Sequence, residues 1–408
     1  MLLRFRFSNF RSFCAEQELS LIAGASRDHS DVVQHPAGIR EGVLPVAAIY
    51  GANASGKTNV IRAFEFMASA VRSSHRIWEP EGPIPRDPFL ADKESSREPS
   101  GFEVDFLQGG VRRRYGFRID SEAVLEEWLY AYPRGKKQTW FHRTRGSPTT
   151  FSAKMAGENR TIENLTRRNS LFLSAAAQNS HETLLPIYKW LTGQLFVTGD
   201  RSAFRERTAK LFMLPDYTGE LVRLFSGADL GITGVKVRGK GVSGDQFDLR
   251  FWHQFGDKAV FGDKVVIFEA DRESDGTMAY FSLLGPAIEA LKDGSTLFID
   301  EIDASLHPLL AIQLIRVFND PSSNRNGAQL IFNTHDTNLL NNDFLRRDQI
   351  WFTEKNKDAS SHLYPLSDFK PRKKENLQSG YLQGRYGAIP FINSDAFLLS
   401  FEANNGKA

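Results

Sequence analysis

The sequence predicts an α/β fold that combines a mixed β-sheet, an antiparallel β meander and an inserted helical lobe. Between residues 276 and 334, segments with helical periodicity alternate with short apolar segments, which is the order of an α/β architecture. Residues 102–132 contain runs of alternating apolar and polar side chains, and Gly109 and Gly110 mark a hairpin turn between the first two. Residues 160–230 then carry mostly helical spacing, which indicates the lobe.

The N-terminal region is expected to begin with β structure. Residues 2–7 and 19–22 alternate apolar and polar side chains, as antiparallel strands do. Residues 46–50 form an uninterrupted apolar run that suits a strand buried on both faces. After a glycine-rich loop, apolar positions between residues 60 and 71 recur with the period of a helix, which should end near residues 72–74.

The remaining segments complete the expected order. Residues 78–100 are rich in Pro, Gly, Ser and charge, which predicts a loop. Glycine-rich turns at 226–244 should lead to strands at 247–251 and 265–270. Helices and strands then alternate in the order 276–292, 296–300, 305–319 and 329–334.

Length and composition limit the kinds of protein that this chain can be. Its 408 residues suggest two halves of one core, 1–155 and 271–408, with a helical and β lobe inserted at 156–270. The 51 Lys and Arg nearly balance the 49 Asp and Glu, so any nucleic-acid binding must be local. A single cysteine, Cys14, excludes an intramolecular disulfide and Cys-rich zinc sites. Without a signal-peptide core or a long apolar run, we expect a cytoplasmic protein that does not span a membrane.

Residues 51–58, Gly-Ala-Asn-Ala-Ser-Gly-Lys-Thr, fit the phosphate-loop pattern G-x-x-x-x-G-K-[ST] between the expected strand and helix. In such a loop, backbone N–H groups surround the phosphates and the helix presents its positive end. Lys57 would reach the β- and γ-phosphates, and the Thr58 hydroxyl would ligate Mg²⁺. The residues predicted to bind the nucleotide are Asn53, Ala54, Ser55, Gly56, Lys57 and Thr58.

Two later strands are expected to end in polar side chains. The apolar run 296–299 is followed by Asp300, which would help to hold Mg²⁺, and by Glu301, which would deprotonate an attacking water. The run 329–334 is followed by His335, which could sense the γ-phosphate. In a parallel sheet these residues emerge at the same edge as the phosphate loop.

These motifs, together with the Ala-Ser-Leu-His-Pro run at 304–308, resemble an ABC-type ATPase head of the group that includes RecF-like and SMC-like heads and OLD-type phage-defence ATPases. The resemblance places the signature serine and glycine at Ser274 and Gly276, which would contact the γ-phosphate held by the opposite protomer. Taken alone, that segment is simply a capped helix start. The glutamine that such heads use at Mg²⁺ would be Gln178, with Gln138 as the alternative.

Residues 7–13, 49–58 and 384–390 look closer to the stand-alone RloA and AbiL type ATPases of bacterial antiphage loci. This resemblance implies an enzyme that uses ATP and Mg²⁺ and works as a homodimer or higher homo-oligomer. OLD proteins carry a C-terminal nuclease, whereas only 73 residues (408 minus 335) follow His335 and hold no evident acidic metal cluster. The resemblance therefore implies a separately encoded effector, a toxin or nuclease, that the ATPase controls in phage defence.

Other functions stay open at the level of sequence. The chain could be a slowly hydrolysing scaffold or antitoxin that sequesters an effector, or a RecF-like DNA-binding repair ATPase. Basic clusters at 112–118, 134–137, 201–210 and 370–374 keep DNA or RNA among the candidate partners, although solvated faces explain most such runs. A P-loop kinase is disfavoured, because Asp300, Glu301 and His335 suit hydrolysis better than transfer to an acceptor.

Overall fold

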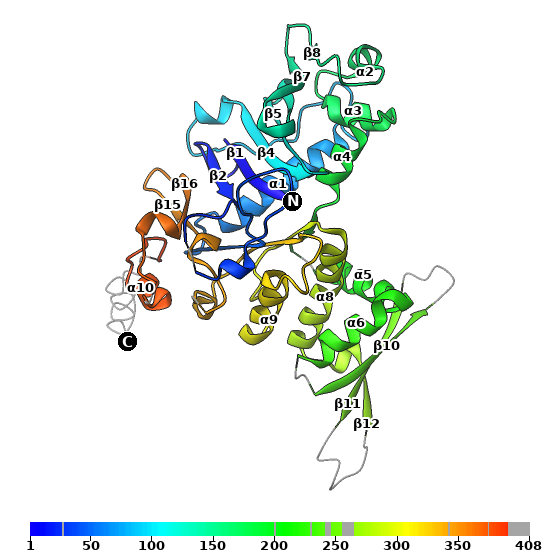
Figure 1. The fold of residues 1–408 in the computed structure, drawn as a ribbon, viewed down its shortest axis with the longest axis vertical. Helices are drawn as coiled ribbons and strands as arrows, with labels where there is room; N and C mark the ends of the chain where they lie inside the picture. Colours follow the sequence, from blue (N-terminus) through cyan, green and yellow to red (C-terminus); the bar gives the residue numbers. More distant parts are fainter. Residues whose placement is uncertain are drawn as a thin grey trace, which may run out of the picture.

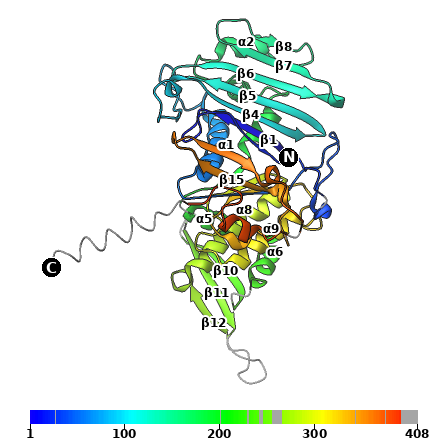
Figure 2. The same cartoon turned by 90° about the vertical axis from the view of Figure 1, so that its left-hand side faces the viewer.

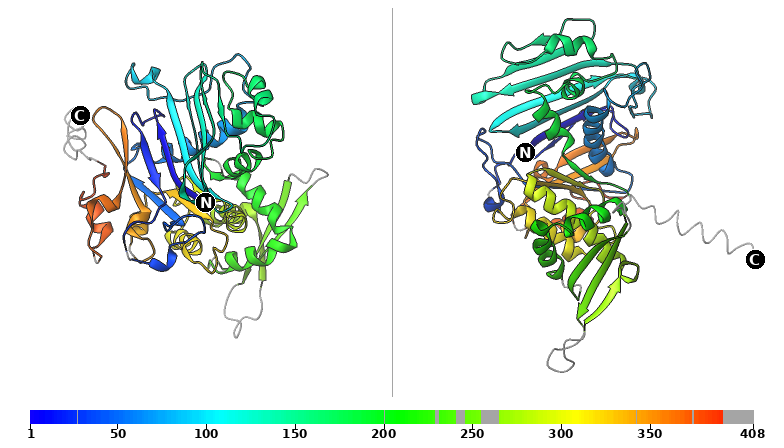
Figure 3. Two further views of the ribbon diagram at one scale, coloured as in Figure 1. Left: turned by 45° about the horizontal axis from the view of Figure 1, so that its top comes forward. Right: turned by 90° about the vertical axis from the view of Figure 1, so that its right-hand side faces the viewer.

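The computed structural model describes residues 1–26, 28–199, 201–228, 231–240, 246–254, 265–341, 343–373 and 375–390. Three β-sheets and the helices around them form an elongated molecule (Figure 1). The antiparallel sheet lies at one end, a mixed sheet lies in the middle, and a three-stranded sheet lies at the other end (Figure 3). No helix in the described ranges is both long enough and apolar enough to cross a membrane.

The antiparallel sheet confirms the predicted meander and the predicted N-terminal strands. Its strands, in spatial order, are β2 (Gln17–Ser20), β1 (Leu2–Ser8), β4 (Ser100–Gln108), β5 (Val111–Ile119), β6 (Val124–Tyr132), β7 (Gln138–Thr144) and β8 (Thr150–Phe151). Gly109 and Gly110 form the turn between β4 and β5 with φ angles of 57° and 70°, a region that glycine enters without strain.

The mixed sheet provides the edge at which the predicted motifs meet. Its order is β16 (Ser361–Pro365), β15 (Ile350–Lys355), β3 (Val46–Gly51), β14 (Gln329–Asn333), β13 (Thr296–Ile299) and β9 (Leu195–Val197). All neighbours from β15 to β9 are parallel, and β16 is an antiparallel edge strand. The carboxyl ends of the parallel strands therefore share one edge, where open α/β sheets place their ligands.

The helices follow the predicted order, with the core helices closest to expectation. They are α1 (Lys57–Ser73), α2 (Asn159–Leu165), α3 (Phe172–Gln178), α4 (Leu185–Thr192), α5 (Ser202–Phe212), α6 (Pro215–Ser226), α8 (Asp275–Asp293), α9 (Pro308–Asn319) and α10 (Leu377–Leu382). The helix predicted from the periodicity of residues 60–71 is confirmed as α1, and those predicted at 276–292 and 305–319 are confirmed as α8 and α9, although α9 begins three residues later than expected.

Two strands differ from the sequence-based expectation. β9 interrupts the segment expected to be helical, because its three residues pair with β13 in the mixed sheet. The expected turns at 226–244 contain β10 (Ile232–Lys240), which pairs with β11 (Gln246–Gln254), and β11 pairs in turn with β12 (Val265–Glu269). Pairing along β11 stabilises β10 despite its glycines, and the Trp252 ring packs over Gly234.

The mixed sheet is covered on both faces, as its continuous apolar strands require. In β3, Ala47 and Ile49 belong to the core shared with α1 and the antiparallel sheet, whereas Val46, Ala48 and Tyr50 belong to the core shared with α8 and α9. Figure 2 shows α1 between the antiparallel sheet and the mixed sheet.

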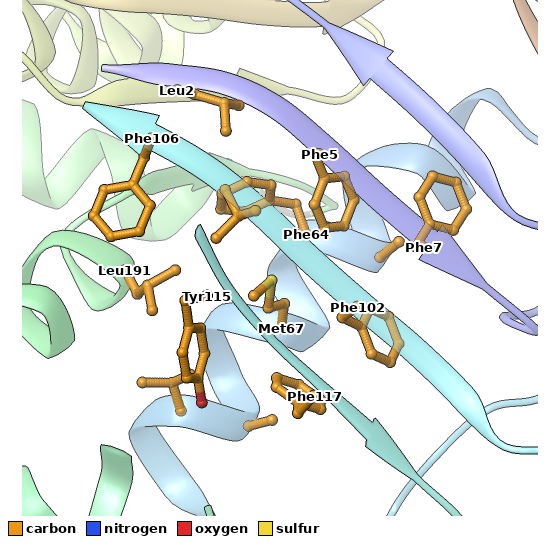
Figure 4. Packing of buried hydrophobic residues seen from close by; sticks show 14 of the residues in the cluster. Leu2, Phe5, Phe7, Phe64, Met67, Phe102, Phe106, Tyr115, Phe117 and Leu191 are labelled. Carbon is orange, nitrogen blue, oxygen red and sulfur yellow. The ribbon is translucent and has the colours of Figure 1, made fainter. Parts of the chain in front are cut away.

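The first core is rich in aromatic side chains (Figure 4). Phe64 of α1 packs against Phe5 of β1 with ring centroids 4.8 Å apart and against Phe298 of β13 at 4.7 Å. Burial of one such side chain stabilises the fold by roughly 1.5–3 kcal/mol. This packing fixes α1, and with it the phosphate loop, against both sheets.

Helix α8 contains Pro286, which has no backbone N–H to donate to the carbonyl of Ser282. The buried Thr208 hydroxyl of α5 compensates, since it lies 3.4 Å from that carbonyl and accepts a hydrogen bond from the Gly285 N–H at 3.1 Å. A Cβ atom at Gly285 would lie 2.4 Å from this hydroxyl oxygen, so glycine permits the close approach of the two helices.

Candidate functional site

The phosphate loop joins the end of β3 to the start of α1 and lines a cavity of about 820 Å³. Ala54 and Gly56 have φ angles of 59° and 109°, which turn the backbone around the cavity. A Cβ atom at Gly56 would lie 2.8 Å from Ser361 Oγ and 2.9 Å from Ser12 Oγ, so only glycine fits there. The cavity is lined by Ser12, Asn53, Ala54, Ser55, Gly56, Lys57, Thr58, Asn59, Glu301, His335 and Lys355.

The Lys57 side chain folds back over the loop. Its Nζ donates to the carbonyl oxygens of Gly51 at 2.9 Å and Ala52 at 3.0 Å, and lies 3.4 Å from His335 Nδ1. Burial lowers the pKa of Lys57 to about 8, while the nearby carboxylates Glu301, Asp303 and Asp300 act in the opposite direction. Lys57 therefore stays predominantly positive at neutral pH, as a group that binds phosphate must.

Thr58 and Asp300 meet although 242 residues separate them in the chain. The Thr58 hydroxyl donates to Asp300 Oδ1 at 2.8 Å, and Asn333 Nδ2 donates to the same oxygen at 2.5 Å. Hydroxyl and carboxylate oxygens are the ligands that Mg²⁺ prefers, so the pair fits a magnesium site beside bound phosphate. Within the described ranges, no group of three or more His, Cys, Asp or Glu side chains forms a further metal site.

Glu301 follows β13 in a conformation that is uncommon for a residue with a side chain. Its φ angle is 53°, and the left-handed region costs a non-glycine residue about 1–2 kcal/mol. The Glu301 N–H donates to Asn333 Oδ1 at 2.7 Å, and its carbonyl accepts from Arg201 Nη2 at 2.7 Å. The exposed side chain lines the cavity, where a carboxylate can accept a proton from water.

His335 lies next to Lys57, directly after β14 and Thr334. β14 is hydrogen-bonded to both β3 and β13, which places His335 between the phosphate loop and Glu301. Its backbone N–H is 3.4 Å from Asp303 Oδ2. Burial, and next the positive charge of Lys57, lower the pKa of His335, while the carboxylates Asp303, Glu301 and Asp300 oppose that shift. The imidazole is therefore predominantly neutral at pH 7.

A family model described as "AAA domain, putative AbiEii toxin, Type IV TA system" matches residues 46–341, from the start of β3 to just beyond His335. The chain belongs to this AAA family. Similar solved structures include "SMC head domain from Thermotoga maritima", with 13% identity, a TM-score of 0.43, and coverage of 89% of this chain and 98% of that one. Another is "Crystal structure of the SmcHead bound to the C-winged helix domain of ScpA", at 12% identity and TM-score 0.39, covering 89% and 96%. No curated protein matches the chain.

In this AAA domain, the candidate signature residues lie at the start of α8, away from the cavity of their own chain. Ser274 caps the helix, since its Oγ accepts from the Thr277 N–H at 3.1 Å. A Cβ atom at Gly276 would lie 3.2 Å from the carbonyl oxygen of Ser305. Neither Ser274 nor Gly276 is among the described residues that line the phosphate-loop cavity.

The structure does not bring Gln178 to Thr58 and Asp300. Gln178 ends α3, which contacts the far end of α1, where the His75 N–H donates to Ser174 Oγ at 3.2 Å. A 17-residue helix is about 25 Å long, so Thr58 lies roughly that far from this contact. Gln138 begins β7 in the antiparallel sheet.

Two residues that the sequence analysis did not single out contact the acidic pair. Asn333 is fully buried at the end of β14 and bonds to both Asp300 and Glu301. Arg201 follows β9 and had been placed only in a basic cluster, yet it binds the backbone after Glu301. An amide in an otherwise apolar strand is a signal for Asn333, because a buried amide needs partners. Arg201 offered no comparable signal.

The basic cluster at 112–118 is partly neutralised within the chain. Arg112 and Arg114 contact Asp105 at 2.8 and 2.9 Å, and the Asp105 side chain is fully buried. The positive charges of Arg112 and Arg114 are therefore paired with a carboxylate of the same chain. Lys374, in the cluster at 370–374, lies outside the described residues.

Proposed function

We propose that this AAA domain binds ATP with Mg²⁺, hydrolyses it to ADP and phosphate, and acts as a nucleotide-driven dimeric switch on a separately encoded effector in bacterial phage defence. One observation carries the catalytic part of this proposal. Residues from distant parts of the chain gather at one sheet edge beside the phosphate loop, with Lys57, Glu301 and His335 lining its cavity and Asp300 bonded to Thr58.

Each of these side chains has a definable task in hydrolysis. Lys57 and the loop N–H groups hold the β- and γ-phosphates. Glu301 accepts a proton from water while the water oxygen bonds to the γ-phosphorus and the bond to the β–γ bridging oxygen breaks. Neutral His335 contacts the γ-phosphate. Thr58 and Asp300 would hold Mg²⁺, which neutralises phosphate charge when bound.

The proposed switch and its effector are supported by the position of the candidate signature and by the family. Ser274 and Gly276 lie at the N-terminus of the 19-residue helix α8, outside the cavity of their own chain. From this position they could contact phosphate that is bound in the cavity of a second chain. The family description names a type IV toxin–antitoxin system, and residues 7–13, 49–58 and 384–390 resemble RloA and AbiL type ATPases. The family description names the toxin of a two-component system, which supports a second, separately encoded component. The resemblance supports control of an effector encoded elsewhere.

Two substitutions test the catalytic part. Lys57→Ala is expected to abolish ATP binding, because the main cation for the phosphates is lost. Glu301→Gln is expected to slow phosphate release by about 10²- to 10⁴-fold and to leave ATP affinity unchanged. Calorimetric titration and a phosphate-release assay measure the two effects, with the exposed Glu41→Gln as control. Equal loss of ATP binding in both variants, or normal turnover in Glu301→Gln, would contradict the assignment.

A further inference from the structure

The backbone of Glu301 is held at both of its hydrogen-bonding groups by side chains from other elements. Asn333 of β14 accepts from the N–H at 2.7 Å, and Arg201 donates to the carbonyl at 2.7 Å. A left-handed residue that is not glycine persists only where its surroundings fix it. These two contacts therefore help to keep Glu301 in its conformation at the cavity.

The two anchors differ in origin. Asn333 is fully buried in the mixed sheet and also donates to Asp300, so it belongs to the rigid core. Arg201 stands at the N-cap of α5, which packs against α8 through the contact of Thr208 with Gly285. Glu301 is thus contacted by a strand of the mixed sheet and by the residue that begins α5.

The Arg201 contact uses the shape of the guanidinium group. Nη2 donates to the Glu301 carbonyl at 2.7 Å, and Nη1 donates to the Ala304 carbonyl at 2.9 Å. The two carbonyls lie on either side of a short turn in which the Ala304 N–H bonds back to Glu301 O at 2.9 Å. A planar fork can hold both carbonyls at once, whereas a lysine ammonium lacks this geometry.

We propose that Arg201 is a positioning residue for hydrolysis: it holds the turn after Glu301 from the N-terminus of α5 and so keeps the Glu301 carboxylate aimed at the attacking water. This inference rests on the proposed ATPase function. It adds a role for a residue that is not among those that line the phosphate-loop cavity.

The first test compares Arg201→Met and Arg201→Lys with the wild type in steady-state ATP hydrolysis. Both are expected to lower kcat by about 10- to 100-fold and to leave KM for ATP unchanged, because misplacement of a catalytic group by about 1 Å can cost that much. The control is Arg205→Met, an exposed position one turn along α5, which should keep wild-type kinetics. If Arg201→Lys keeps the wild-type kcat, a positive charge at this position is sufficient without the planar guanidinium group, and the proposal fails.

The second test combines Arg201→Met with Glu301→Gln. If Arg201 acts through Glu301, the double variant hydrolyses ATP no more slowly than Glu301→Gln alone. A further loss of the same size as in the single variant would overturn the proposal, since it would show that Arg201 acts independently of Glu301.

The outcomes also separate this inference from the function on which it rests. A normal rate in Glu301→Gln would reject Glu301 as the base, and the positioning role would fall with it. A slow Glu301→Gln together with a normal Arg201→Met would reject only the role of Arg201. Circular dichroism melting of each variant checks that a lost rate does not come from unfolding.

Discussion

Lys57 and His335 are electrostatically coupled, since Nζ of the lysine lies 3.4 Å from Nδ1 of the imidazole. Burial is the larger cause of the lowered pKa of His335, and the Lys57 charge is the second. His335 therefore binds fewer protons in the folded than in the unfolded chain. Its contribution to stability is present above the ordinary pKa of 6.5 and is lost as the pH falls through the folded-state value.

Replacing Lys57 with methionine should raise the pKa of His335 towards its ordinary value, because one of the two lowering causes is removed. Burial of the ring would still lower the pKa, and the carboxylates Asp303, Glu301 and Asp300 would still raise it. An NMR titration of the His335 ring protons between about pH 5 and pH 8 measures the change. Arg205→Met should leave the value as in the wild type. An unchanged or lower pKa in Lys57→Met would show that the two groups are not coupled.

Among the elements, α8 depends most clearly on a neighbouring helix. Pro286 removes one internal hydrogen bond, and Thr208 of α5 contacts both the Ser282 carbonyl and the Gly285 N–H. Because Ser274 caps the same helix, this contact also supports the position of the candidate signature.

Thr208→Val keeps the shape of the side chain but removes its hydroxyl. It is expected to lower the free energy of unfolding by about 1–3 kcal/mol, since buried backbone groups lose their partner. Thr208→Ser keeps the hydroxyl and loses one methyl group, so its cost should be smaller, near 1 kcal/mol. Urea denaturation followed by circular dichroism compares the two. A Thr208→Val protein as stable as the wild type would contradict this reading of the α5–α8 contact.

Sequence patterns predicted the elements whose signals are local. β3, α1, β13 and β14 follow from continuous apolar runs, helical periodicity and the phosphate-loop spacing. β9 was missed, because three residues between helical segments carry too little periodicity and become a strand only by pairing with β13. Gln178 was preferred to Gln138 as the glutamine that the family resemblance implies, and only the path of the chain shows that it lies beside the far end of α1.

The contacts at the site divide in the same way, into those that local sequence patterns predict and those that they do not. Lys57, Asp300 and Glu301 belong to recognisable motifs, whereas Arg201 bonds to a carbonyl 100 residues away, which no local pattern encodes. Asn333 stands between these cases, since its place in an apolar strand is visible but its two partners are not.

At the scale of the whole molecule, the candidate site residues of one chain lie in two separate places. The cavity holds Lys57 and Glu301, while Ser274 lies at the start of α8 outside it. If a second chain supplies Ser274, ATP binding closes the pair and hydrolysis opens it, which is a ligand-biased two-state switch. A net charge of +2 gives little long-range repulsion between two copies.

The most direct measurement is the solution mass of Glu301→Gln by light scattering, with and without ATP and Mg²⁺, and again with Ser274→Arg added. Glu301→Gln should keep ATP bound long enough to hold a closed dimer. We expect the mass to rise from about that of a single 46.0 kDa chain to twice that value with ATP, and Ser274→Arg to prevent the rise. A mass that responds neither to ATP nor to Ser274→Arg would contradict the composite site and the switch built on it.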